Sequence, residues 1–206
     1  MRKSLPIIQS IRLFAWFFTM FGLLSLSGCA SFYLDNATRE VPVSEFKKPG
    51  MPKPVQVIFE FQTKGVANGR ATDYFAPLVF DQIKESGLFS SVDKSPVEGG
   101  ALLNVVLNNV PLSDDAFSKG FATGLTFGLV GSQVSDGYVC TMKYLSGSQA
   151  PAITTSARHA IHTTMGAKSG PDNGTKMESL EIAAKTMSRQ IISTTLNQLS
   201  REEGFR

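Results

Sequence analysis

Residues that commonly carry catalysis or bind metals are scarce in this sequence. Among 206 residues there are two cysteines, two histidines and one tryptophan. The chain has no G-x-S-x-G motif, no phosphate-binding loop and no dinucleotide fingerprint, and no internal repeat is visible. The sequence therefore gives no support to the hydrolase and nucleotide-binding classes that such motifs mark.

The two histidines, His159 and His162, are three residues apart in a segment rich in threonine. Such composition favours a β-strand, and on a strand this spacing places the two side chains on opposite faces. A shared metal ion is then excluded, and no cysteine or acidic residue stands at metal-ligand spacing beside them. We expect no metal site and no cofactor.

Cys140 is the second candidate for chemistry. It alternates with Tyr138 and Met142, which is typical of a small buried apolar group on a strand. A nucleophilic role would need a positioned base; the sequence identifies none, and His159 is a candidate only by default. We predict that the protein is not an enzyme, with a lipid-tethered enzyme that uses Cys140 or His159 as the weaker alternative.

Charge is unevenly distributed along the chain. The formal net charge is +3, and three of the 20 Lys and Arg lie in the first 12 residues, which contain no acid. The other 17 balance 17 Asp and Glu. The basic excess thus belongs to the amino-terminal segment, and no nucleic-acid partner is predicted.

The amino terminus has the pattern of a secretory signal peptide. Its basic start is followed by an apolar stretch over residues 13–26, which is shorter than the roughly 20 residues of a membrane-spanning helix. The stretch ends in LSGC, formed by Leu26, Ser27, Gly28 and Cys29. This tetrapeptide resembles the lipobox of bacterial lipoproteins.

The resemblance implies a role for each position of the tetrapeptide. Leu26, Ser27 and Gly28 would be recognised by the lipid-transfer and cleavage enzymes. Cys29 would receive a diacylglyceryl group, become the new first residue and usually carry a further acyl chain, such as palmitate, on its amino group. The alternative is an uncleaved membrane helix that leaves Cys29 unmodified.

The resemblance also implies a location. Two or more acyl chains anchor a protein stably, since each buried methylene contributes about 0.8 kcal/mol. In enterobacterial lipoproteins an Asp directly after the lipidated Cys favours the inner membrane, and Ala30 and Ser31 stand here instead. We expect an outer-membrane protein, anchored in the membrane through lipidated Cys29 and facing the periplasm.

Four segments are predicted along the chain. Residues 1–28 form the signal peptide, and residues 29–54 form a lipidated tether that its prolines keep irregular and flexible. Residues 55–200 form a single periplasmic domain, and residues 201–206 a carboxy-terminal tail.

Alternation of apolar and polar residues predicts the strands of this domain. Long strands are expected over residues 55–62, 101–110, 134–145 and 152–164, with a short strand at 91–93 and a hairpin turn between the last two long strands.

Two helices complete the predicted domain. The first, capped by Thr72 or Asp73, is regular from about Ala76 because Pro77 should lie near its start, and it stops at Gly87. The second covers residues 176–199, with Leu180 on its packed stripe. This order predicts an α+β fold, with two main helices on one face of a mostly antiparallel sheet.

A glycine-spaced segment at residues 117–131 places Gly120, Gly124 and Gly128 four residues apart. One interpretation is a core loop or short helix folded over the sheet. The other is an exposed apolar flap that contacts lipid or a partner. Its contact residues would be Phe121, Leu125, Phe127 and Leu129.

A weaker resemblance concerns the domain itself. FAPLVFDQIKESGLFSSV, residues 75–92, is similar to the strand-helix-strand domain at the amino end of TolB and to small periplasmic envelope lipoproteins. The resemblance implies a non-enzymatic module that binds another envelope protein through its sheet or its glycine-spaced segment. The alternative is a carrier of lipid or another apolar ligand.

Overall fold

The computed structural model describes residues 30–112, 133–147, 149–166 and 169–205. A compact unit extends from Ser31 to Arg206. The glycine-spaced segment, including Phe121, Leu125, Phe127 and Leu129, lies outside the described residues, as do Leu26, Ser27, Gly28 and Cys29.

The strands form a single sheet. Their bounds are β1 (Ala30–Asp35), β2 (Val55–Thr63), β3 (Val66–Ala67), β4 (Val92–Asp93), β5 (Ala101–Leu112), β6 (Gln133–Leu145), β7 (Ile153–Met165) and β8 (Gly174–Met177). The order across the sheet is β3-β2-β5-β6-β7-β1-β8, and β4 pairs with β2. Pairing is antiparallel from β5 to β7, whereas β2 runs parallel to β5 and to β4.

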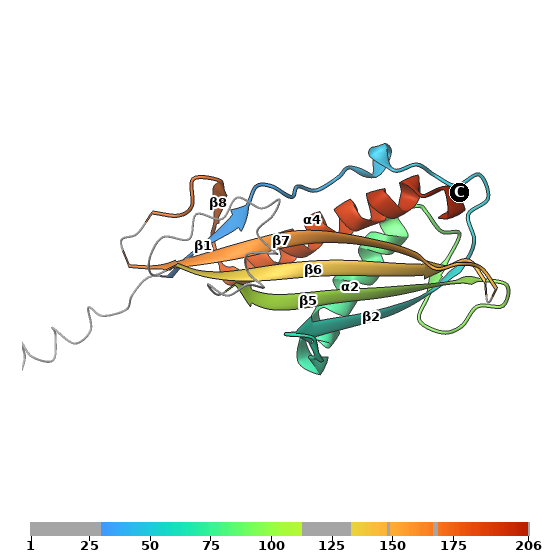
Figure 1. Cartoon of the computed structure of the whole chain (residues 1–206), viewed down its shortest axis with the longest axis horizontal. Helices are drawn as coiled ribbons and strands as arrows, with labels where there is room; N and C mark the ends of the chain where they lie inside the picture. The colour runs from blue at the N-terminus through green and yellow to red at the C-terminus, as the bar shows by residue number, and fades with distance from the viewer. Residues whose placement is uncertain (1–29, 113–132, 148, 167–168, 206) are drawn as a thin grey trace, which may run out of the picture. The chain divides into compact units, whose positions relative to one another are not determined.

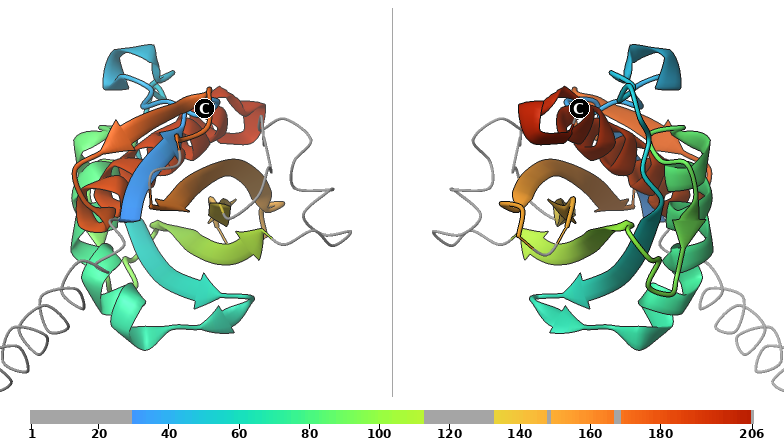
Figure 2. Two further views of the ribbon diagram at one scale, coloured as in Figure 1. Left: turned by 90° about the vertical axis from the view of Figure 1, so that its left-hand side faces the viewer. Right: turned by 90° about the vertical axis from the view of Figure 1, so that its right-hand side faces the viewer.

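Two long helices cover one face of this sheet. They are α2 (Gly69–Glu85) and α4 (Leu180–Arg201). Two short 3-10 helices are also present: η3 (Glu203–Phe205) follows α4 in the sequence, and η2 (Val43–Glu45) accepts a hydrogen bond from Arg201 of α4. Figure 2 shows α2 and α4 on the same side of β5, β6 and β7. The predicted α+β class, with both helices on one face of a mostly antiparallel sheet, is confirmed.

The core lies between the helices and the sheet because alternate residues of each strand are apolar. Leu103, Val105 and Leu107 of β5 are fully buried, and the register places Leu107 opposite Cys140. From α2, Phe75 stacks on Phe61 of β2 with 5.2 Å between ring centroids. The predicted strands and their buried faces therefore agree with the structure.

Residues 30–54 differ from the predicted tether. Residues 30–35 form β1 in the sheet, and Leu34 and Phe46 are buried in the core. Beyond β1, Val41 N–H donates to Ser193 Oγ (3.0 Å) and Lys47 N–H to Ser200 Oγ (3.1 Å), so the segment follows α4 (Figure 1). The prolines prevent regular structure here, but they do not prevent packing through apolar side chains and backbone hydrogen bonds.

The helix starts also differ from the prediction. Helix α2 begins at Gly69, capped by Asn68, whose Oδ1 accepts from Ala71 N–H (3.1 Å), and Pro77 lies inside it. The apolar stripe of α2 outweighs the hydrogen bond that Pro77 cannot make. Helix α4 begins at Leu180 rather than at residue 176, because residues 174–177 pair with β1 as strand β8. Leu180 is exposed and so does not belong to the packed stripe of the helix.

The carboxy-terminal tail is part of the folded unit. Phe205, within the predicted tail 201–206, is buried. Its ring lies 4.9 Å from that of Tyr144 and 5.7 Å from that of Phe89, in edge-to-face geometry. The domain therefore extends beyond residue 200 as far as this aromatic contact.

Candidate binding site

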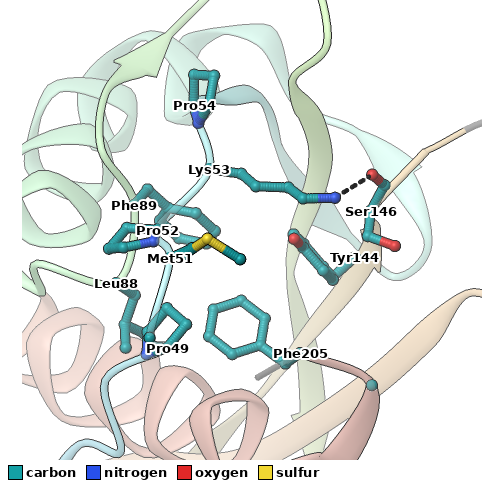
Figure 3. A pocket seen from close by; sticks show the side chains of 12 residues that line it. Pro49, Met51, Pro52, Lys53, Pro54, Leu88, Phe89, Tyr144, Ser146 and Phe205 are labelled. Atoms are coloured by element: carbon teal, nitrogen blue, oxygen red, sulfur yellow. Dashed lines mark hydrogen bonds between the residues drawn. The ribbon is translucent and has the colours of Figure 1, made fainter.

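A cavity of about 510 Å³ opens at the end of the sheet where β2 begins and β6 ends (Figure 3). We call it the distal pocket. Ligand pockets in proteins commonly have volumes of about 300–1,000 Å³, so its size suits a side chain, a short peptide segment or part of a lipid. Its lining comprises Pro49, Gly50, Met51, Pro52, Lys53, Pro54, Leu88, Phe89, Tyr144, Ser146, Gly204 and Phe205.

The wall and floor of the distal pocket are aromatic. Phe89, Tyr144 and Phe205 come from three separate parts of the chain and pack with their rings edge-to-face or tilted. Burial raises the pKa of the Tyr144 hydroxyl, so this group stays neutral at physiological pH. These rings offer an uncharged apolar contact surface to a ligand.

The proline-rich strand entry, residues 49–54, forms the opposite wall. Backbone bonds fix it: Ser90 N–H donates to Lys53 O (3.0 Å), and Ala101 N–H to Pro54 O (2.8 Å). Lys53 Nζ donates to Ser146 O at 3.3 Å across the opening (Figure 3). Met51 is 88% exposed. The pocket thus combines a fixed frame with one free apolar side chain at its rim.

Cys140 is inaccessible in the structure. Its side chain is fully buried on the helix face of the sheet. Burial raises the pKa of the Cys140 thiol to about 12, and a hydrogen bond with Thr195 of α4 opposes this only in part. The thiolate is absent at neutral pH, in agreement with the predicted small buried apolar group.

His159 is held under α4 and is also fully buried. Ala160 N–H donates to His159 Nδ1 (2.8 Å), and His159 Nε2 is hydrogen-bonded to Gln190 Oε1 (2.5 Å). Burial lowers the pKa of the imidazole, against the hydrogen bonds with Gln190 and Ala160 and the charge of Asp35. This ring is a structural hydrogen-bonding group rather than an accessible base.

His162 projects from the other face of β7, as its spacing from His159 predicts. Its Nε2 lies 3.5 Å from Oδ2 of Asp35, and both side chains are buried. The residues described in the structure contain no group of three or more His, Cys, Asp or Glu side chains that could hold a metal ion. The two histidines are therefore not brought together.

The distal pocket was not predicted from the sequence. Leu88 and Phe89, which follow the end of α2, are both buried. Phe205, an aromatic residue in an otherwise polar tail, is the signal in the sequence that could have pointed to it. Within the described ranges, no helix is long and apolar enough to cross a membrane.

Comparisons with known proteins give distant structural likenesses. No known family model and no curated protein sequence matches the chain. Two dodecamer structures of PelC from Paraburkholderia phytofirmans, one of them a variant, align with 84% and 85% of this chain and 100% of their own. Their identities to this chain are 12% and 10%, and their TM-scores 0.34 and 0.35.

A third solved structure is described as "a putative lipoprotein" from Caulobacter crescentus CB15. The alignment covers 71% of this chain and 84% of the Caulobacter chain, at 10% identity and a TM-score of 0.25. These likenesses concern the fold alone.

Proposed function

We propose that this protein is a lipid-anchored binding module of the bacterial cell envelope. Its mature chain begins at Cys29, carries acyl chains there and faces the periplasm from the outer membrane. The observation that carries this proposal is the tetrapeptide LSGC at residues 26–29, which stands directly before the first strand of the folded unit, β1 at Ala30. A lipid on Cys29 would hold the whole unit at a membrane surface.

Binding rather than catalysis is supported by the position of the two residues that offered chemistry. A nucleophile must reach its substrate, and Cys140 is buried beneath α4 with a pKa of about 12. His159 is buried as well, and both of its ring nitrogens already have partners. Neither side chain lines the distal pocket.

The distal pocket is the surface that we assign to the binding function. It is apolar, aromatic and framed by a fixed proline-rich wall, which are properties of sites that hold an inserted side chain or peptide segment. We infer that its partner is another envelope protein that inserts an apolar side chain between Met51 and the aromatic rings. The face of the sheet away from α2 and α4 is the competing surface. It is open at Ile58 of β2, which is exposed, and buried at Ala160 and His162 of β7.

A carrier of lipid or another apolar ligand is the second candidate function. The volume of about 510 Å³ and the aromatic part of the lining would accept part of an acyl chain. In this case the pocket would hold a small molecule rather than a segment of a partner.

Photo-cross-linking separates these functions. A photoreactive benzoylphenylalanine replaces Met51 at the pocket rim, and in a matched variant it replaces Ile58 on the open sheet face. We expect a protein adduct from the Met51 variant in cell membranes and none from the Ile58 variant. A lipid adduct at Met51 would favour the carrier, whereas adducts at Ile58 alone, or none at either position, would contradict a binding role for the distal pocket.

A further inference from the structure

Strand β1, strand β7, strand β8 and helix α4 each begin or end at one end of the folded unit, which we call the β1 end. Strand β1 runs antiparallel to β8, so Phe32 lies opposite Met177, just before α4 begins at Leu180. Asp35 contacts His162, and Thr38 Oγ1 donates to Arg158 O (2.6 Å). Strand β1 therefore also runs opposite to β7, and its first residues lie near the end of β7 at Met165.

Exposed apolar side chains concentrate at the β1 end. Met165 is 62% exposed, Leu180 49% and Ile182 39%. Tyr74, in the first turns of α2, is also exposed. Its hydroxyl lies 3.4 Å from Glu181 Oε1 in the first turn of α4, which places Tyr74 beside Leu180 and Ile182. Figure 2, left, looks at this end of the unit. Apolar side chains that are exposed together usually mark a contact surface.

Charges of both signs lie near the start of α4. Lys176 and Lys185 face solvent near Glu178 and Glu181, and Lys185 Nζ forms an ion pair with Glu181 Oε1 (2.8 Å). Together these four described side chains carry no net charge that would attract anionic lipid headgroups. Contact of this part of the surface with a membrane would therefore rest on its apolar side chains.

The sequence fixes how far a lipid on Cys29 can lie from this end. Ala30 follows Cys29 directly, and Phe32 is already paired with Met177. Three Cα–Cα steps of about 3.8 Å separate Cys29 from Phe32, so the two lie within about 11 Å of each other. This inference rests on the proposed lipid anchor: with acyl chains on Cys29, the short connection would keep the β1 end at the bilayer surface.

We propose that the β1 end itself contacts the lipid bilayer. Met165, Leu180 and Ile182 enter the boundary between headgroups and acyl chains, with Tyr74 at headgroup level, where amphipathic aromatic rings are enriched. Only a few apolar side chains make this contact. It forms because the acyl chains of Cys29 raise the local concentration of these side chains at the membrane. The distal pocket lies at the other end of the sheet, where β2 begins and β6 ends, and would then point away from the membrane.

Site-directed fluorescence tests this orientation on the full-length lipidated protein. The protein is reconstituted into phosphatidylethanolamine–phosphatidylglycerol vesicles with bimane on a cysteine introduced as Leu180→Cys, or as Met165→Cys if the first variant fails to fold. Met51→Cys at the distal pocket is the matched exposed control. Cys140 is fully buried and does not compete for the label.

We expect a spin-labelled lipid to quench bimane at position 180 or 165 several-fold more strongly than at position 51. Aqueous iodide should show the reverse order, and high salt should not change either result, because the contact is apolar. Equal quenching at both ends, in protein whose mass shows acylated Cys29, would overturn the orientation and leave the proposed anchor intact. Unacylated protein that washes off the vesicles would overturn the anchor and the orientation together.

Discussion

Leu103→Ala is expected to lower the free energy of unfolding by about 2–5 kcal/mol. Leu103 is fully buried at the centre of the sheet, on the face that α2 and α4 cover. Its strand, β5, pairs on one side with β2 and on the other with β6. Truncation removes apolar contacts and leaves a cavity that this fixed framework cannot close. Urea denaturation followed by circular dichroism measures the loss.

The neighbouring residue supplies the control for this prediction. Leu102 has the same side chain but lies on the open face of the sheet and is only partly buried. Leu102→Ala should therefore cost much less, about 1 kcal/mol or below, because less apolar area leaves water. Similar losses for the two variants would mean that the open face is packed as tightly as the core, which would contradict the architecture.

The stability of the protein should fall as the pH is lowered below about 6.5, the ordinary pKa of histidine. Burial lowers the pKa of His159 in the folded state. Between the folded and unfolded pKa values the unfolded chain binds a proton that the folded chain excludes. The contribution of the neutral ring is thus complete above pH 6.5 and is lost as the pH falls, by up to about 1.4 kcal/mol per pH unit.

A pH series of urea titrations on wild type and His159→Gln checks this linkage. The variant is expected to be less stable at pH 7, because the contact with Gln190 changes, and to lose less stability on acidification. Parallel pH profiles would show that His159 does not resist protonation in the folded state.

Local patterns in the sequence predicted the sheet well. The alternation of Leu103, Val105 and Leu107 marks a strand with one buried face, because strand side chains have period two whatever lies on either side. The stop of α2 was also predictable, since Gly87 adopts a positive φ of 62° just after the helix. These features depend on a few neighbouring residues, and single-sequence patterns record them.

Features that depend on distant partners were not predictable. The proline-rich residues 36–54 have no period of their own, and their fixed course depends on hydroxyl groups of α4 about 150 residues away, such as Ser193 and Ser200. Strand β8 replaced a predicted first turn of helix because its partner is β1, at the other end of the chain. Pairing across such separations leaves no local signal.

The candidate site was hidden for the same reason. Tyr144 and Phe89 read as ordinary core residues, and Phe205 lies in a segment that was predicted to be a tail. The pocket exists only because the end of α4 brings Phe205 to the other two rings. The tetrapeptide LSGC, in contrast, is contiguous, so its resemblance to a lipobox and the prediction that Cys29 is modified needed only the sequence.

The two ends of the unit have different roles in this account. The lipid on Cys29 and the exposed side chains at the β1 end would hold the protein at the membrane. The distal pocket would then present its aromatic lining to the periplasm. A module of this kind needs no catalytic group, which fits the burial of Cys140 and His159.

Intact-protein mass spectrometry of the membrane fraction, comparing wild type with Cys29→Ser, determines whether Cys29 carries the lipid anchor. We expect a wild-type mass that fits cleavage before Cys29 plus a diacylglyceryl group and a further acyl chain, and the loss of this species in the variant. An uncleaved, unmodified chain in the wild-type membrane fraction would contradict it and would make residues 13–26 the membrane anchor.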